Sequence, residues 1–362
     1  PTTRYNRDIV TMVYRDYILD YYGKTLKKTS DLKSNACLAP SQPIPTFVLK
    51  ALKKIHPEVT PKYYGCGLVV PECLEDCKLL DLGSGSGRDC YMLSQLVGEK
   101  GHVTGIDMTE DQVHNCVVHC IYVQAKFPFF LFLFWSTVSV LGTHLFFFLV
   151  NFSPDKRKVL SDAYRLLKVH CVLSCRNQLI TTKNTSMNPF KLMLMLSLGE
   201  CLGGALWWGD QVRLAQEVGL GLPRLVTANV ITVDNMELDA TDYQFVSATY
   251  RLFKVPKISN KASLVIYNGN ITGFGESLEF DAQYTFKVDE VVEVDGEVAS
   301  ILSHSRFAEE FTFQPPGVPA GCGVKEPKVG TVNPFELVLQ LGSATVSSAT
   351  GGCCGAESSC CK

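Results

Sequence analysis

Residues 79–89 read Leu-Leu-Asp-Leu-Gly-Ser-Gly-Ser-Gly-Arg-Asp, a pattern that indicates a strand, a glycine turn and the start of a helix. The residues before the glycines are typical of a short buried strand, and those after Gly87 of a helix that runs to about Gly98. Glycines on alternate positions permit a tight turn in which a ligand can lie against the backbone. The N-terminus of the helix points N–H groups at that ligand, which favours a bound carboxylate or phosphate.

The charges around this turn indicate which ligand it holds. Dinucleotide folds use the spacing G-x-G-x-x-G, whereas here Arg88 stands where the third glycine would fall. Asp81, at the end of the strand, would repel a pyrophosphate but attracts a cation. A second strand over residues 102–108 ends in Asp107, 20 residues after Gly87, from where a carboxylate can bind both ribose hydroxyls.

S-adenosylmethionine fits these charges, because it carries a sulfonium, an ammonium and one carboxylate. The alternative, an ordinary strand-to-helix turn, leaves the two acids unexplained. The predicted cofactor-binding residues are Asp81, Gly83, Ser84, Gly85, Gly87, Asp107 and Met108.

Composition narrows the classes of function. A net charge of -2 gives no basic surface for nucleic acid, so a nucleic-acid partner is not expected. The chain has 15 cysteines but no Cys-x-x-Cys pair of the kind that structural zinc sites use. In a long chain without a secretory signal pattern, this number favours thiol, metal or metalloid chemistry and a cytosolic location. Cys66 lies between two glycines, a setting that favours an exposed, reactive thiol.

The chain divides into four predicted parts. Residues 1–70 form an N-terminal helical and cysteine-containing segment, whose helix over 8–26 carries a stripe of tyrosines expected to pack on a core. Residues 71–198 form the domain built on the glycine turn. Residues 199–316 form an α+β domain with a closing helix over 297–303. Its predicted strands are 224–233, 243–255, 263–267 and 278–287. Residues 317–362 are rich in Gly, Ser and Ala and are expected to be a disordered, cysteine-containing tail.

Two stretches of the second part lack the pattern of alternating strands and helices. Residues 127–152 carry no Asp, Glu, Lys or Arg, and residues 169–198 show no clear period. Hydropathy alone makes 127–150 a candidate membrane span, since about 20 apolar residues suffice. Because neither stretch has the period of a strand or an amphipathic helix, we interpret 117–152 and 169–198 as atypical. We hypothesise that they derive from translated non-coding sequence.

Several motifs together resemble the animal arsenite methyltransferases, over about residues 7–116, 154–168 and 198–316. They are the Tyr-Tyr-Gly-Cys-Gly of 63–67, the stretch 81–89, the Gly-Ile-Asp-Met of 105–108, 199–204, 224–229, 245–249 and the Gly-Gly-Cys-Cys of 351–354. The resemblance implies an α/β fold, with a Rossmann-like S-adenosylmethionine methyltransferase domain and a C-terminal α+β domain. It also implies stepwise methyl transfer to a small trivalent arsenical in the cytosol, with a thiol reductant such as thioredoxin or glutathione.

The family uses four cysteines, and the resemblance assigns three of them here. Cys37 and Cys66 match an N-terminal pair that binds arsenic and can form a disulfide as arsenic is re-reduced. Cys201 matches one of two cysteines in the core, which gives an arsenic(III) site of Cys37, Cys66 and Cys201. The fourth is absent, because the matching place before Asn151 reads Phe-Phe-Leu-Val over 147–150.

The family's central strand, and the Gly-Gly turn and strand after Lys168, are also expected to be missing, which predicts poor folding. Cys171 or Cys175 could stand in for the lost ligand. Two alternatives to a methyltransferase stay open: a catalytically inactive, thiol-rich arsenic-binding protein, and a membrane-anchored variant that uses 127–150. Membrane association is not expected from the rest of the chain.

Overall fold

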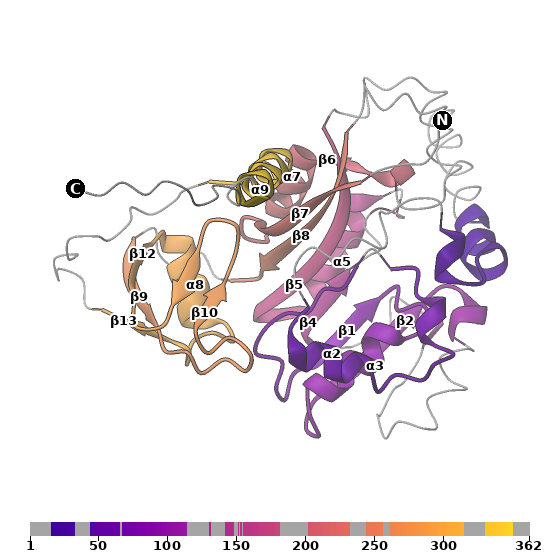
Figure 1. Cartoon of the computed structure of the whole chain (residues 1–362), viewed down its shortest axis with the longest axis horizontal. Helices are drawn as coiled ribbons and strands as arrows, with labels where there is room; N and C mark the ends of the chain where they lie inside the picture. Colours follow the sequence, from indigo (N-terminus) through magenta and orange to yellow (C-terminus); the bar gives the residue numbers. More distant parts are fainter. Residues whose placement is uncertain are drawn as a thin grey trace, which may run out of the picture.

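The computed structural model describes most of the chain. The described residues are 16–32, 44–65, 67–113, 130–131, 142–147, 151, 153, 155–181, 202–231, 244–255, 261–314 and 330–349, and for 130–131, 142–147 and 342–349 the backbone alone is described. In these residues a large mixed sheet forms the centre of the molecule, with helices on both faces and a smaller domain at one end (Figure 1).

The larger sheet has eight strands among the described residues, in the order β3-β2-β1-β4-β5-β8-β7, with β6 paired to β5. Strands β3, β2, β1, β4 and β5 run parallel to one another. β8 pairs antiparallel with β5, and the edge strand β7 pairs antiparallel with β8. Their bounds are β1 Lys78–Leu82, β2 His102–Asp107, β3 Phe130–Leu131, β4 Gly142–Phe147, β5 Leu167–Ile180, β6 Leu206–Trp207, β7 Arg224–Ile231 and β8 Phe245–Phe253.

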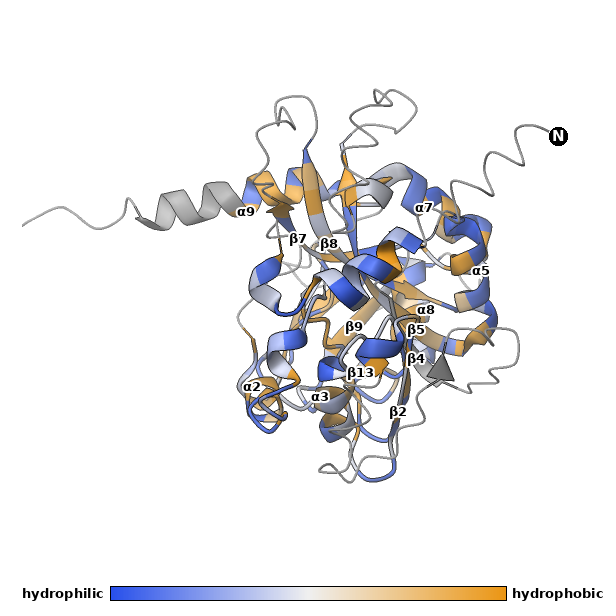
Figure 2. Cartoon of the chain, turned by 90° about the vertical axis from the view of Figure 1, so that its right-hand side faces the viewer, coloured by the Kyte–Doolittle hydropathy of each residue, from blue (hydrophilic) through white to orange (hydrophobic). Residues whose placement is uncertain are grey.

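Each face of the sheet is covered by its own helices because successive side chains of a strand point to opposite sides. Leu79 of β1 packs with helices α2 (Thr46–Leu52) and α3 (Arg88–Leu96). Leu80 and Leu82 belong to the core shared with α5 (Lys156–Leu166), α7 (Trp208–Glu217) and α9 (Pro334–Ala349). Figure 2 shows the polar residues of α5 and α7 on the outside and the apolar residues of the strands between the layers.

The smaller domain has its own core and joins the sheet at one end of β5 and β8. Strands β12 (Val291–Val294), β9 (Ser263–Tyr267) and β13 (Phe311–Phe313) form one sheet, and β10 (Ser277–Glu279) and β11 (Thr285–Lys287) form a second. Helix α8 (Gly296–His304) begins after Asp295, whose side chain accepts from Glu297 N and Val298 N. The core includes Val172 and Phe253 of the larger sheet, so the two parts share a packed contact.

Short helical turns complete the described elements. They are a π-turn at Tyr21–Thr25, which follows helical residues 16–20, and 3-10 turns at Thr29–Asp31, Thr60–Lys62 and Leu202–Gly204.

The expectation that central strands are missing is wrong. β4 lies inside the atypical stretch 117–152, and β5 overlaps the atypical stretch 169–198. β4 pairs with both β1 and β5, so it fills the centre of the sheet and leaves neither neighbour unpaired there. Residues 142–147 are therefore a sheet strand and not part of a membrane-crossing helix. Among the described residues no helix combines the length and the apolar character needed to cross a membrane.

Three further expectations differ from the structure. Strands β7 and β8, which the sequence groups with the α+β domain 199–316, extend the larger sheet, and the smaller sheets lie within residues 261–314. The single strand expected over 278–287 is the β10–β11 hairpin. The tail, expected to be disordered from about residue 317, contains α9, because Phe335, Leu337 and Val338 find apolar partners in the core beneath the sheet.

Candidate cofactor and substrate site

The glycine turn lies at the carboxyl end of β1 and leads directly into α3. Gly83 N and Ser84 N both donate to the carbonyl oxygen of Ile106 on β2, at 2.7 and 3.0 Å. These bonds tie the start of the turn to the neighbouring strand. Gly87 has a φ of 80° and precedes α3, so the turn ends where the helix begins.

Two glycines at this turn have a clear steric reason. Gly85 has a φ of +52°, and a Cβ built there meets nothing within 4 Å, so this side of the turn is open to a ligand. Gly105 lies on β2 behind the turn, where a Cβ would come within 2.9 Å of the side chains of Ser84 and Cys90. Any larger residue at 105 would push the turn out of place.

Asp107 holds the turn from the end of β2. Its carboxylate accepts from Gly85 N and from Thr109 N, each at 2.8 Å. Burial raises the pKa of Asp107, and the hydrogen bonds from Thr109 and Gly85 oppose that shift. The acid at the end of the second strand therefore lies against the glycine turn, as the parallel pairing of β1 and β2 requires.

Asp81, at the end of β1, is a buried acid whose pKa is raised. It is 2% exposed. Its Oδ2 accepts from Cys90 Sγ at 3.4 Å, and Oδ1 has no hydrogen-bond partner among the described residues. Burial, followed by the charge of Asp89, raises the pKa of Asp81 to about 7. A buried carboxyl with an unsatisfied oxygen favours a ligand that brings a positive charge or a hydrogen-bond donor.

One pocket brings most of the predicted cofactor residues together. Asp81, Gly83, Ser84, Gly85, Asp107 and Met108 all line it, and Gly87 does not. Ser84 is buried, and its Oγ has no hydrogen-bond partner among the described residues. These unsatisfied polar atoms, the open glycine turn and the acidic charge fit S-adenosylmethionine, which offers both cations and hydroxyl donors.

Aromatic residues from the N-terminal segment also line this pocket, and sequence reasoning missed them. They include Tyr22, Tyr63 and Tyr64. The rings of Tyr22 and Tyr64 lie 6.3 Å apart, and Gln112 Nε2 donates to Tyr22 O at 3.1 Å. For Tyr22 a signal was present in the tyrosine stripe of 8–26, but most of that stripe was expected to pack on a core.

Arg88 and Asp89, the first two residues of α3, form an ion pair beside this pocket. Arg88 Nη2 lies 2.7 Å from Asp89 Oδ1, and the guanidinium carbon of Arg88 lies 3.1 Å from the centre of the Tyr63 ring. This stack fixes the ring of Tyr63 at the edge of the cofactor pocket.

The three cysteines predicted to bind arsenic, Cys37, Cys66 and Cys201, lie outside the described residues. Of their neighbours, Gly65 lines the cofactor pocket, and Gly67 packs so closely on the buried Arg176 that a Cβ there would clash with the guanidinium. Within the described ranges, no group of three or more His, Cys, Asp or Glu side chains is placed to hold a metal ion.

Cys171 and Cys175, the two candidates to stand in for the missing fourth cysteine, line neither pocket. Both side chains belong to the apolar core that β5 shares with α5 and α7. Burial raises the pKa of Cys171 to about 11 and that of Cys175 to about 12, which disfavours the thiolate form that binds soft ions. The suggestion that either stands in at the site is therefore not supported by their positions.

Comparisons with known proteins agree with this geometry. Residues 74–119 match a family model described as Methyltransferase domain, and residues 260–361 match one described as Arsenite methyltransferase C-terminal domain. The chain resembles the solved structure of CrArsM, an arsenic(III) S-adenosylmethionine methyltransferase from Chlamydomonas reinhardtii. The identity is 32% and the TM-score 0.69, covering 76% of this chain and 98% of that chain. The fold and the site thus define an S-adenosylmethionine-dependent methyltransferase.

Comparison with curated proteins shows to which family of S-adenosylmethionine-dependent methyltransferases the chain belongs. The chain is 44% identical to the arsenite methyltransferase of Homo sapiens, over 94% of this chain and 96% of the human protein. It is 38% identical to the arsenite methyltransferase of Aquipseudomonas alcaligenes, over 82% of this chain and 89% of that protein. The chain belongs to the arsenite methyltransferase family.

Proposed function

We propose that this protein transfers methyl groups from S-adenosylmethionine to trivalent arsenic. The observation that carries the proposal is the pair of buried acids, Asp81 and Asp107, that flank an open glycine turn in a chain of the arsenite methyltransferase family. When bound, S-adenosylmethionine supplies a methyl group on a positively charged sulfur. In this proposal Asp107 accepts hydrogen bonds from the ribose hydroxyls, and Asp81 attracts the cationic part of the cofactor. The aromatic side chains of Tyr22, Tyr63 and Tyr64 exclude water from the pocket.

The arsenic ligands in this proposal are Cys37, Cys66 and Cys201. Trivalent arsenic is soft and thiophilic, so thiolates are its natural ligands. Arsenic held by sulfur keeps a lone pair that can attack the sulfonium methyl group. The main contribution of the protein is to position the two reactants. The assignment is supported by the family motifs around Cys66 and Cys201. Lacking the fourth cysteine, this chain is expected to turn over more slowly than its relatives.

The reduction step extends the proposal. Transfer of the methyl group raises the formal oxidation state of arsenic by two, and two thiolates can return both electrons by forming a disulfide. We assign this role to Cys37 and Cys66, with thioredoxin or glutathione then reducing the disulfide. A cytosolic location, where such thiol systems are maintained, is part of the same proposal.

A thiol-rich arsenic binder without turnover is the second candidate. It is favoured by one observation, the lack of a cysteine before Asn151. Both candidates bind arsenite, and they differ in whether a methyl group is transferred.

The roles of the cysteines are tested with radiolabelled methyl groups. Purified protein is given arsenite, a thiol reductant and S-adenosylmethionine labelled in its methyl group, and label on arsenic is counted. Cys37→Ser, Cys66→Ser and Cys201→Ser are each expected to lower the initial rate at least tenfold. Cys73→Ser, a cysteine of the described residues that lines neither pocket, is the matched control and is expected to keep the rate. Equal rates in all four variants would refute the assignment.

A further inference from the structure

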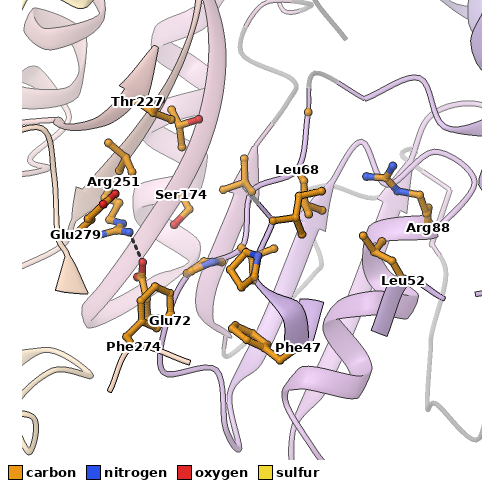
Figure 3. A pocket seen from close by; sticks show the side chains of 18 of the residues that line it. Phe47, Leu52, Leu68, Glu72, Arg88, Ser174, Thr227, Arg251, Phe274 and Glu279 are labelled. Atoms are coloured by element: carbon orange, nitrogen blue, oxygen red, sulfur yellow. Dashed lines mark hydrogen bonds and ion pairs between the residues drawn. The ribbon is translucent and has the colours of Figure 1, made fainter. Parts of the chain in front are cut away.

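A second cavity, of about 630 Å³, lies between the larger sheet, the N-terminal segment and the smaller domain (Figure 3). Its size falls within the range of small-molecule sites. No predicted site residue lines it, although Gly67, the residue after Cys66, does.

This cavity shares a wall with the cofactor pocket. Tyr63 lines both spaces. Arg88, which stacks on the Tyr63 ring, faces the cavity, while its ion-pair partner Asp89 lines the cofactor pocket. A ligand in the cavity is therefore separated from the cofactor by about one layer of side chains.

The sheet side of the cavity is a row of hydroxyl groups from three neighbouring strands. Ser174 comes from β5, Thr249 from β8 and Thr227 from β7. Thr227 lies opposite Thr249 in the β7–β8 pairing, and Ser174 lies opposite Arg251 in the β5–β8 pairing. Ser174 Oγ and Thr249 Oγ1 have no hydrogen-bond partner among the described residues, although the side chains are only 2% and 7% exposed.

A buried hydroxyl without a hydrogen-bond partner is costly for the ligand-free protein. A ligand with hydroxyl groups of its own would recover that cost. The sheet side of the cavity therefore favours a hydroxyl-bearing ligand.

The opposite side of the cavity is apolar. It is formed by Ile44, Phe47, Leu52, Leu68, Val69 and Val70. Figure 3 shows Phe47, Leu52 and Leu68 across the space from Ser174. A ligand that spans the cavity thus meets hydroxyl groups on one side and hydrocarbon on the other.

The charged side chains of the cavity are already paired. Glu72 bonds both Arg251 and Arg306, and Arg88 bonds Asp89. Glu279 also has an interaction partner. An ionic ligand would have to compete with these pairs, whereas a neutral ligand would not. The chemistry that fits is a small neutral molecule with hydroxyl groups and apolar substituents.

We propose that this cavity is a docking site for the neutral arsenical before it binds the cysteines. This inference rests on the proposed function. Arsenous acid and its methylated derivatives are neutral molecules in which each added methyl group replaces one hydroxyl. The hydroxyls lie on Ser174 and Thr249, and the methyl groups lie on the side of Phe47 and Leu68. Exchange with a cysteine then forms an arsenic–sulfur bond, breaks an arsenic–oxygen bond and releases one water for each thiol consumed.

The test compares two arsenicals that differ in their numbers of hydroxyl and methyl groups. Affinities are measured by equilibrium dialysis on the full chain carrying Cys37→Ser, Cys66→Ser and Cys201→Ser, so that binding to the proposed cysteine ligands does not mask docking. The two ligands are arsenous acid, with three hydroxyls, and dimethylarsinous acid, with one hydroxyl and two methyl groups. S-adenosylhomocysteine is present, so that no methyl transfer occurs. Thr249→Val, which is isosteric, is expected to weaken arsenous acid about threefold or more relative to dimethylarsinous acid. Leu68→Ala is expected to shift the ratio of affinities in the opposite direction.

Ser300→Ala is the matched control, because Ser300 is a buried serine of α8 whose Oγ also lacks a partner but does not line the cavity. It is expected to leave the ratio unchanged. An equal effect of Thr249→Val on both arsenicals, or a ratio change in the control as large as in Thr249→Val, would overturn the docking site. Dialysis needs no turnover, so a protein that fails to methylate arsenic refutes the proposed function while this ratio still decides the docking site.

Discussion

At the scale of single residues, Asp81 determines how the site responds to pH. Its pKa is raised to about 7, so near neutral pH the carboxyl is protonated in about half of the molecules. Only the ionised form attracts a cationic ligand. We therefore expect the affinity for S-adenosylmethionine to rise by up to about tenfold between pH 6 and pH 8, measured by calorimetric titration.

The variant Asp81→Asn is the control for this prediction, because its amide has nearly the same shape and does not titrate. It is expected to bind more weakly and with an affinity independent of pH between 6 and 8. If wild type and Asp81→Asn showed the same pH dependence, another group would be responsible.

The same carboxyl affects stability in the ligand-free protein. Its folded pKa of about 7 lies above the ordinary value of 3.8, so between these values the folded state binds more protons than the unfolded state. The contribution of Asp81 to stability is therefore favourable at low pH and is lost as pH rises from about 4 to about 7. Ionisation of Asp81 near neutral pH therefore lowers the stability of the ligand-free protein and raises its affinity for S-adenosylmethionine.

At the scale of elements, the parts that sequence patterns predicted are those with a strong local signal. β1, α3 and β2 follow from an apolar run, a glycine turn and a second run, and β9 was predicted with its observed bounds, Ser263–Tyr267. The closing helix expected over 297–303 is α8, which the Asp295 cap begins one residue earlier.

β5 could not be predicted because its sequence does not resemble a central strand. Parallel strands buried on both faces are usually continuous apolar runs. β5 instead buries Arg176, Asn177 and Gln178, each at most 1% exposed. Its strand conformation follows from pairing with β4 and β8 on either side, and local composition carries no signal of such partners.

Polar burial in β5 gives a prediction for stability. Gln178 is 0% exposed, and neither side-chain amide atom has a hydrogen-bond partner among the described residues. Replacing it with a residue of similar size and no polar atoms should remove the cost of this unsatisfied amide. We expect Gln178→Leu to raise the free energy of unfolding in urea by about 1 kcal/mol.

The comparison variant is Gln178→Glu, which places a charge in the same space and is expected to lower the free energy of unfolding. A loss of stability in Gln178→Leu would mean that the amide is satisfied in solution. The prediction tests the placement of β5 directly, because in an exposed loop both variants would be nearly neutral.

The candidate site also contains residues that could be predicted from the sequence and residues that could not. The turn and its two acids were found because their spacing is local and their charges are informative. The aromatic wall from Tyr22, Tyr63 and Tyr64 was missed, because only the fold brings residues so distant in sequence to the turn. The hydroxyl row of Ser174, Thr227 and Thr249 needs the pairing of three strands and has no signature in the sequence.

At the scale of the whole molecule, a buried ion network joins the larger sheet to the smaller domain. Both line the cavity of about 630 Å³ in which we place the neutral arsenical. Glu72 precedes β1, Arg251 lies on β8, and Arg306 belongs to the smaller domain. Arg251 also donates to Phe280 O in the smaller domain. The smaller domain is thereby fixed against the sheet, and the cavity between them keeps its shape.

The family assignment and the geometry both indicate that this chain methylates arsenic. Its relatives over nearly the full length carry the same family name, and the cofactor turn is intact. The missing fourth cysteine bears on rate, since three proposed thiolate ligands remain.

The most direct test is to incubate the purified full chain with arsenite, S-adenosylmethionine and a thioredoxin or glutathione system, and to separate the arsenic species by chromatography with mass detection. We expect monomethylated arsenic to appear only when S-adenosylmethionine is present, together with an equal amount of S-adenosylhomocysteine. Arsenite that binds to the protein but stays unmethylated would contradict the claim and leave the arsenic-binding protein as the correct description.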